Sequence, residues 1–316
     1  MSDEDFVLLQ IRGGIVEWYS SSREMYDIVY MSKVFSDEYT PDIPEPQNAK
    51  KVIKGGTGYA IELKDGKEIY YNELDPDLPS EIEHIFPDYS IYPQYTGYGQ
   101  IQRKQTAYGF LTRGCPRACD FCHVVPKEGR CSRKVADLSQ FWDGQGNICL
   151  SDPNILACKE RADLLAQLVE SNAVVDFNQG LDARLITKES AEFLAKMKLK
   201  TPHFAMDSMK DIEAVKRGLK LYVDACKRIR GKWNWRNAKV FCLTNFNTTH
   251  KEDLYRIKVI QECECWPYIM SYNKPSAMKI TRRLQRWTNN PILYATNKTF
   301  DEYQSKAYKK VLTDGN

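Results

Sequence analysis

Short apolar runs alternate with helical patterns through most of the chain, from residue 107 onward. The runs are rich in β-branched and aromatic residues and have the length of buried strands. They predict six strands: Ala107–Thr112, Ile148–Ser151, Val174–Asn178, His203–Met206, Lys239–Leu243 and Tyr268–Ser271. Strands that alternate with helices are typical of repeated βα units around a parallel sheet, and six such units suggest an open barrel.

The segments between these runs carry apolar residues at helical spacing. Four of them are predicted to form amphipathic helices: Ala157–Glu170, the segment after Thr187, Lys210–Arg230 and the segment after Thr249. Thr187 is a residue type that caps helices, and Thr249-x-x-Glu252 has the pattern of a capping box. We expect the apolar face of each helix to pack against the sheet.

The first hundred residues have a different pattern. Glycine-punctuated apolar stretches predict short strands at Gly14–Trp18, Asp27–Met31 and Val52–Gly58, with a proline-rich spacer at Pro41–Pro46. We therefore predict a small separate domain at residues 1–100 and a larger α/β domain at 101–275. Residues 276–316 are predicted to form a basic helix, with Ile280, Leu284 and Trp287 on one face, and a polar tail.

Three of the ten cysteines stand together directly after the first predicted strand. Cys115, Cys119 and Cys122 have the spacing C-x3-C-x2-C. Three thiolates on one short loop can hold three irons of a 4Fe-4S cube, and the fourth iron then has no protein ligand. The alternatives are a zinc site or packing thiols. Structural zinc needs four ligands, commonly two separated pairs, and no second pair has that spacing here.

This spacing, Phe121 just before the third cysteine and the entry Gly114-Cys115-Pro116 resemble the radical S-adenosylmethionine (SAM) superfamily. The resemblance implies a partial (β/α)6 TIM-like barrel and a 4Fe-4S cluster on Cys115, Cys119 and Cys122. It implies that SAM binds the open iron and is cleaved reductively to a 5′-deoxyadenosyl radical, which takes hydrogen from a substrate. A one-electron reductant such as flavodoxin or ferredoxin would be a partner.

These residues do not specify which substrate is modified or what the final reaction is. The entry Thr112-Arg113-Gly114-Cys115-Pro116 is similar to that of methylthiotransferases that act on tRNA, but their N-terminal cysteine set and RNA-binding tail domain are not recognisable. Modification of RNA or protein by a methylthiotransferase-like or methyltransferase-like enzyme is therefore an expectation by analogy. A rival class is a non-catalytic iron-sulfur carrier or sensor, although a carrier normally saturates its cluster with four cysteines. A nucleic-acid-binding module with a structural metal is a third.

The resemblance also implies contacts to SAM from the carboxyl ends of the strands. Phe121 would lie against the adenine. Most members have Gly-Gly-Glu after the second strand, whereas this chain has Asp152-Pro153-Asn154. Asp152 or Asn154 could accept the same hydrogen bonds, or the segment could form a turn and helix cap.

Further contacts to SAM are expected after the third and fourth strands. Gln179, Asp182 and Arg184 follow the third, and the Arg184 guanidinium suits a carboxylate. Asp207 and Ser208 follow the fourth, where the resemblance implies a ribose contact. Alternatively, Asp182 pairs with Arg184 or caps a helix, and Asp207-Ser208 caps the helix that follows.

Residues 1–100 resemble a remnant of the Rossmann-like cobalamin-binding domain that precedes the barrel in one branch of the superfamily. The cobalt-ligating motif Asp-x-His-x-x-Gly of that branch is not found in the sequence. We therefore expect a structural docking domain and do not expect cobalamin as a cofactor.

The net charge of +3 hides an asymmetry between the two parts of the chain. Residues 1–100 carry 8 basic and 19 acidic residues, a net charge of −11, whereas the rest carries 37 and 23, a net charge of +14. The opposite charges favour docking of the two parts, or leave a basic body for an anionic macromolecule as substrate. The run Arg228–Arg236 mixes cations with Trp233 and Trp235. Such a mixture can bind phosphates and stack on bases. Alternatively, the run is an exposed connection whose tryptophans pack on a neighbouring element.

The sequence also predicts the compartment. No apolar run reaches the roughly 18 residues of a membrane span, and the acidic start differs from a secretory leader. We expect a cytoplasmic protein that does not bind membranes. Ten cysteines in a reducing compartment are expected to be ligands and core thiols rather than disulfides.

Overall fold

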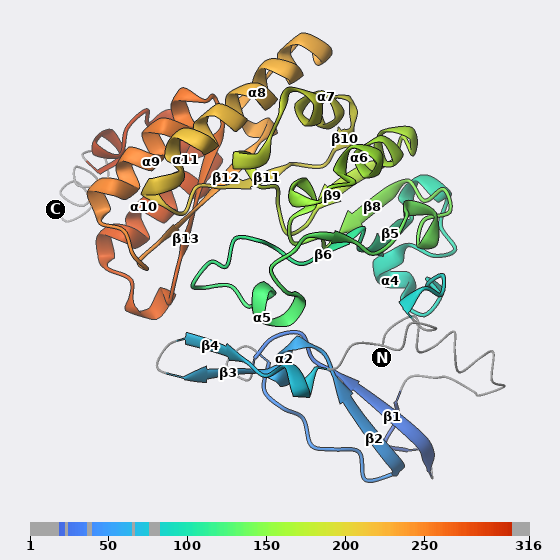
Figure 1. Ribbon diagram of the computed structural model, residues 1–316. Helices are drawn as coiled ribbons and strands as arrows, with labels where there is room; N and C mark the ends of the chain where they lie inside the picture. Colours follow the sequence, from blue (N-terminus) through green and yellow to red (C-terminus); the bar gives the residue numbers. More distant parts are fainter. Residues whose placement is uncertain (1–18, 23–24, 37–39, 65–66, 76–82, 305–316) are drawn as a thin grey trace. The chain divides into compact units, whose positions relative to one another are not determined.

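The computed structural model describes residues 19–22, 25–36, 40–64, 67–75 and 83–304, and Figure 1 labels their elements. The chain divides into two compact units, Met1–Glu160 and Arg161–Asn316. The helices are α2 Thr57–Ala60, α4 Pro93–Thr96, α5 Val124–Glu128, α6 Arg161–Glu170, α7 Lys188–Lys196, α8 Ile212–Arg230, α9 His250–Glu262, α10 Lys279–Asn289 and α11 Pro291–Thr296. The strands are β1 Tyr26–Ser32, β2 Ala49–Gly55, β3 Ile61–Lys64, β4 Lys67–Tyr70, β5 Thr106–Gly109, β6 Thr112–Arg113, β7 Arg133–Lys134, β8 Asn147–Leu150, β9 Val174–Phe177, β10 Lys198–Leu199, β11 His203–Ala205, β12 Lys239–Thr244 and β13 Trp266–Ser271.

The first unit contains two parallel strand pairs and two antiparallel ones. β1 pairs with β2 and β5 pairs with β8 in parallel, with Thr106 opposite Asn147 in the second pair. β3 and β4 form a hairpin, and β6 pairs antiparallel with β7. Parallel partners cannot be joined by a tight turn, so each pair encloses a long connection. The connection between β5 and β8 contains the cysteine loop.

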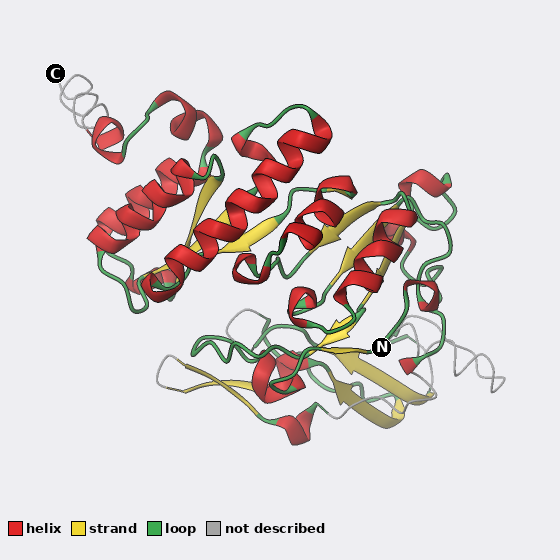
Figure 2. Ribbon diagram, turned by 45° about the horizontal axis from the view of Figure 1, so that its top comes forward, coloured by secondary structure: helices red, strands yellow, loops and turns green. Residues whose placement is uncertain are grey.

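The second unit has only parallel strand pairs among its described residues. β9 pairs with β10, and β11, β12 and β13 form a three-stranded sheet in that order. Helices occur in the crossovers, and Figure 2 shows them lying against the strands of this unit. The protein is therefore mixed α/β with parallel sheets, which confirms the predicted class.

The predicted strands and helices can be compared with the observed ones individually. Each of the six strands predicted from residue 107 onward falls on an observed strand, and the helix of Lys210–Arg230 is α8. Thr187 caps α7, and the Thr249–Glu252 capping box opens α9. The helix predicted at Ala157–Glu170 begins only at Arg161, because Ile155–Ala157 forms a 3-10 turn that Cys158 ends in an extended conformation.

The first predicted strand, Ala107–Thr112, is divided into β5 and β6. The backbone N–H groups of Leu111 and Thr112 donate to the Asp152 carboxylate instead of to a neighbouring strand. The chain therefore leaves the β5–β8 pair at Phe110 and turns into the cysteine loop. The carboxylate that causes this break is distant in the sequence, so the local apolar pattern could not predict it.

Burial of apolar side chains accounts for the packing of the second unit. The long helix α8 buries Val215, Leu219 and Val223 along one face, and Leu164, Leu165 and Leu168 are buried on α6. Each fully buried side chain of this size stabilises the fold by about 1.5–3 kcal/mol relative to an exposed one. α10 buries Leu284 and Trp287, as predicted, whereas Ile280 is only half-buried.

The N-terminal predictions are met in part. Asp27–Met31 lies in β1, but the strand predicted at Val52–Gly58 ends at Gly55 because α2 begins at Thr57. Gly14–Trp18 lies outside the described residues. In the described part of the chain, none of the helices combines the length and apolar character needed to cross a bilayer.

Candidate metal centre

The loop between β6 and β7 carries the three clustered cysteines. The short β6–β7 ladder closes this loop at its base, and the Cys115 N–H donates to the Gly129 carbonyl at 3.1 Å. Within the loop the Cys122 N–H donates to the Cys119 carbonyl at 3.0 Å, which makes a tight turn. Cys115, Cys119 and Cys122 are all half-buried. Their backbone is therefore held by hydrogen bonds within the loop, and none of the three residues is fully buried.

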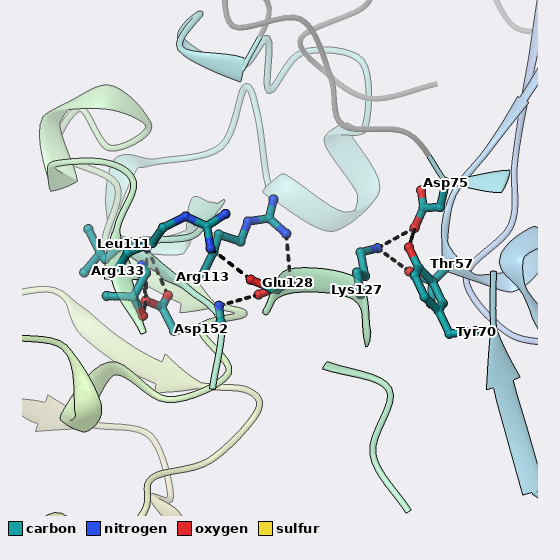
Figure 3. Close-up of polar contacts among 11 residues, drawn as sticks. Thr57, Tyr70, Asp75, Leu111, Arg113, Lys127, Glu128, Arg133 and Asp152 are labelled. Carbon is teal, nitrogen blue, oxygen red and sulfur yellow. Dashed lines mark hydrogen bonds and ion pairs between the residues drawn. The ribbon is translucent and has the colours of Figure 1, made fainter. Parts of the chain in front are cut away.

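Gly114 is required at the start of this loop. Its φ is +86°, and an added Cβ would lie 2.2 Å from the Cys131 carbonyl oxygen. Residues other than glycine rarely adopt this backbone conformation, and no side-chain atom larger than hydrogen fits in the space. The Gly114 N–H donates to Glu128 Oε2 at 2.8 Å, and Arg113 donates to Glu128 Oε1 at 3.2 Å (Figure 3). Glu128 thus ties the beginning of the loop to the end of α5.

Asp152 fastens the strand end from which the loop departs (Figure 3). Its carboxylate accepts hydrogen bonds from Leu111 N at 3.1 Å, Thr112 N at 2.5 Å and Thr112 Oγ1 at 2.6 Å. Burial raises the pKa of Asp152 to about 6, although these hydrogen bonds act in the opposite direction. Asp152, predicted as a contact to SAM, is therefore engaged with the root of the cysteine loop.

Asn154 lies beside the first cysteine. Its Nδ2 is 3.6 Å from Cys115 Sγ, and its backbone carbonyl accepts a hydrogen bond from Ser132 Oγ at 2.9 Å. Only 3% of Asn154 is exposed. Of the two residues predicted after the second strand, Asn154 is thus the one next to a thiol. Phe121 lies in the loop itself and is half-buried.

The remaining cysteines divide by burial. Five are buried, and burial raises their thiol pKa, to about 11 for Cys158 and Cys263 and about 12 for Cys242. The pKa values of Cys226 and Cys265 are raised for the same reason. Since the thiolate is the metal ligand, these side chains are suited to packing rather than to coordination.

The accessible thiols outside the triplet are Cys149, on β8, and Cys131, at the end of the loop. Among the described residues, no three His, Cys, Asp or Glu side chains gather around a point where one metal ion could be held. A cube distributes its thiolates over different irons, so its ligands do not have to converge in this way.

The N-terminal segment contacts the cysteine loop through α5 (Figure 3). Lys127 Nζ donates to Asp75 Oδ2 at 2.7 Å and to Thr57 Oγ1 at 2.5 Å, and the Tyr70 hydroxyl also donates to Asp75 at 2.9 Å. Burial opposes the charge of Asp75, but the hydrogen bonds from Lys127 and Tyr70 outweigh it and lower the pKa of Asp75. Residues of the first hundred are thus fastened to the helix that follows the cysteines.

In the second unit, Arg184 is held by two carboxylates. Its Nε donates to Asp182 Oδ1 at 2.7 Å and its Nη1 to Asp211 Oδ2 at 2.6 Å. Burial opposes the charge of Arg184, yet the hydrogen bonds to both carboxylates outweigh it and raise the pKa of Arg184. Asp182 also caps the 3-10 turn that contains Arg184. The pairing and capping considered as alternatives for these residues are therefore present.

α8 helps to position the turn that contains Arg184. A Cβ on Gly218 would lie 1.7 Å from the carbonyl oxygen of Ala183, so the helix can approach the turn only with glycine there. Gln179, which precedes the turn, is exposed.

Asp207 and Ser208 lie after β11. Asp207 Oδ1 accepts a hydrogen bond from Leu243 N at 2.8 Å, and burial raises the pKa of Asp207. Ser208 accepts a hydrogen bond from Lys210 N at 3.2 Å and caps a 3-10 turn before α8. Ser208 therefore caps the turn before α8, in line with the capping alternative, whereas the Asp207 carboxylate holds the backbone of β12 instead.

Two residues with clear structural roles were not predicted from the sequence. Arg256 on α9 is fully buried and donates to the carbonyls of Met206 and Leu243, each at 2.8 Å, and to Asp253 Oδ1 at 2.5 Å. It joins the ends of β11 and β12. The available signal was an acidic and a basic residue three apart within the apolar pattern of a helix. Glu128, by contrast, ends the short helix α5, and no apolar periodicity around it indicates its role.

The structure brings Asp152 and Asn154 to the cysteine loop within the first unit, and Asp182 to Arg184 within the second. Neither a protein-family model nor a curated protein sequence matches this chain.

Proposed function

We propose that this protein is a radical SAM enzyme, in which Cys115, Cys119 and Cys122 hold a 4Fe-4S cluster. The observation that carries the proposal is the C-x3-C-x2-C triplet of half-buried cysteines on a loop that follows the parallel strand β5 and the short strand β6. The fold that this function implies is a partial (β/α)6 barrel. In α/β folds of this kind, ligands bind where the strands end.

The residues of the loop fit such a group. The three cysteines are only half-buried, whereas burial raises the pKa of each of the five buried cysteines. Arg133 stands at the end of the loop and supplies positive charge that complements an anionic cluster, whereas the charge of Arg113 is paired with Glu128. When bound with SAM, the cluster would supply the electron that cleaves the sulfonium and yields the 5′-deoxyadenosyl radical.

The other residues of the first unit would position this chemistry. Asp152 binds the backbone N–H of Thr112 and Glu128 binds that of Gly114, so the backbone directly before Cys115 is fixed. The Asn154 amide, next to Cys115, is the proposed contact to the amino group of SAM. Phe121 is the proposed contact to the adenine. Gln179, Asp182, Arg184, Asp207 and Ser208 are proposed contacts whose side chains, Gln179 excepted, also make the structural hydrogen bonds described above.

A second candidate function is an iron-sulfur carrier or sensor, and the position of Cys131 favours it. This exposed cysteine ends the same loop, and its carbonyl packs against Gly114, directly before Cys115. A fourth thiolate from Cys131 would saturate the cluster and leave no iron for SAM. The two functions therefore differ in what Cys131 does.

Anaerobic reconstitution of the wild type, Cys119→Ala and Cys131→Ala separates them. The radical SAM proposal expects about four irons and four sulfides per chain in the wild type, their loss in Cys119→Ala and their retention in Cys131→Ala. Adding SAM to the reduced protein should change its electron paramagnetic resonance spectrum. Two results together would favour the carrier: loss of the cluster in Cys131→Ala, and an electron paramagnetic resonance spectrum of the wild type that saturating SAM leaves unchanged. Stoichiometric zinc without iron would contradict both.

A further inference from the structure

A cavity of about 480 Å³ lies in the second unit, lined by aromatic and polar side chains. Trp233, Trp235 and Tyr294 supply its aromatic surface, and Gln261, Ala295 and Lys298 are also part of the lining. This volume falls in the range of about 300–1,000 Å³ that is typical of small-molecule sites. The indoles belong to the run Arg228–Arg236, and the structure adds Tyr294 and Lys298 from the far end of the chain.

The aromatic rings are fixed in place before any ligand arrives. The Trp233 Nε1–H donates to the Glu264 carbonyl at 2.8 Å. The Trp235 ring stands edge-to-face with Trp266 at 5.4 Å and with Tyr294 at 5.0 Å. Rigid rings lose little conformational entropy when a planar group stacks on them, so this lining suits a flat aromatic ligand.

Two charged residues line the cavity, Glu264 and Lys298. Glu264 lines it, but Lys227 pairs with this carboxylate. Lys298, in the lining, is exposed, as are Lys232 and Arg236, which stand next to the two indoles in the sequence. The Arg236 guanidinium lies 5.0 Å from the centre of the Trp235 ring. Two other cations of the run have structural partners, since Arg228 pairs with Glu192 and Arg230 donates to carbonyls at the end of α7. The remaining cations can therefore meet an anion.

The cavity is separate from the strand ends that carry the proposed SAM contacts. Trp235 and Cys265 both line it; Trp235 lies in the turn just before β12, and Cys265 lies just before β13. Both residues are at the amino ends of these strands, whereas Asp207 and Ser208 follow the carboxyl end of β11. Because the strands are parallel, the two groups of residues lie at opposite edges of the sheet.

We infer that this cavity is a nucleotide-binding site that stacks one base on Trp233, Trp235 and Tyr294 and meets its phosphate with Lys298, Lys232 or Arg236. Stacking on aromatic rings beside cations is the combination by which proteins bind single-stranded nucleic acids without a fixed sequence. The inference does not rest on the proposed function, because none of these residues belongs to the cysteine loop.

Tryptophan fluorescence of the full chain tests this site during titration with adenosine monophosphate and, separately, with a short single-stranded RNA. Ala295→Phe should fill the cavity, and we expect it to weaken binding about tenfold or more, the effect of losing a stacked base. Lys298→Glu should weaken binding and reduce its salt dependence. The control is Lys251→Glu, an exposed residue in the first turn of α9, where an acidic side chain suits the helix dipole.

Binding of the mononucleotide as tight as that of RNA would identify a free nucleotide as the ligand, and preference for RNA would identify a nucleic-acid strand. Both results support the site, provided that Ala295→Phe weakens binding and Lys251→Glu does not. Two results would overturn it. One is no binding of either ligand at low salt; the other is binding that both Ala295→Phe and Lys298→Glu leave unchanged.

Discussion

Arg256→Met should strongly destabilise the second unit. The guanidinium is 0% exposed, and its partner Asp253 is only 3% exposed. Methionine replaces the apolar stem of arginine but not the guanidinium, so it leaves the Asp253 carboxylate buried without its cation and the carbonyls of Met206 and Leu243 without their donor. Removing one partner of a buried pair costs about 3–5 kcal/mol of the free energy of unfolding. This is a large part of the roughly 5–15 kcal/mol that stabilises a typical domain.

Denaturant unfolding followed by tryptophan fluorescence measures this cost. Four of the six tryptophans lie in the second unit, so the signal reports mainly on it. Lys258→Met, an exposed change on the same helix, is the matched control and should shift stability by no more than about 0.5 kcal/mol. Asp253→Leu combined with Arg256→Met should recover part of the loss because no uncompensated charge then remains. A cost for Arg256→Met as small as that of the control would refute the reasoning.

Three further outcomes are expected. The folded pKa of Asp152 is raised to about 6, so its contribution to stability is fully present below about pH 4 and is lost as the pH rises through about 6; Asp152→Asn should remove this part of the pH profile of unfolding. Gly114→Ala should prevent cluster reconstitution because its Cβ would lie 2.2 Å from the Cys131 carbonyl oxygen, and normal iron content in this variant would contradict the loop geometry. Arg184→Ala should weaken SAM binding without removing iron if the guanidinium meets the SAM carboxylate; unchanged affinity, measured by calorimetry, would assign it only to the pair with Asp182.

The sequence was most informative where a local pattern determines the structure. The six strands from residue 107 onward follow from short apolar runs between polar segments, and the starts of α7 and α9 follow from Thr187 and Thr249, whose side chains satisfy backbone N–H groups at the helix ends.

Interactions between residues distant in sequence were not predictable in this way. Asp152 acts on Leu111 and Thr112, which are 41 and 40 positions away, and no periodicity links them. The sequence could suggest Asp182, two positions away, as a partner of Arg184, but not Asp211, which lies 27 positions away. For the same reason the cavity beside Trp235 required the structure, since Tyr294 joins it from almost sixty positions away.

Reductive cleavage of SAM tests the central proposal most directly. The reconstituted protein, reduced anaerobically and incubated with SAM, should release 5′-deoxyadenosine, and Cys119→Ala should release none although it remains folded. Cys131→Ala should retain the activity, because the proposal leaves that thiol outside the cluster. If the wild type carries its cluster, is fully reduced and still leaves SAM intact, the protein is not a radical SAM enzyme.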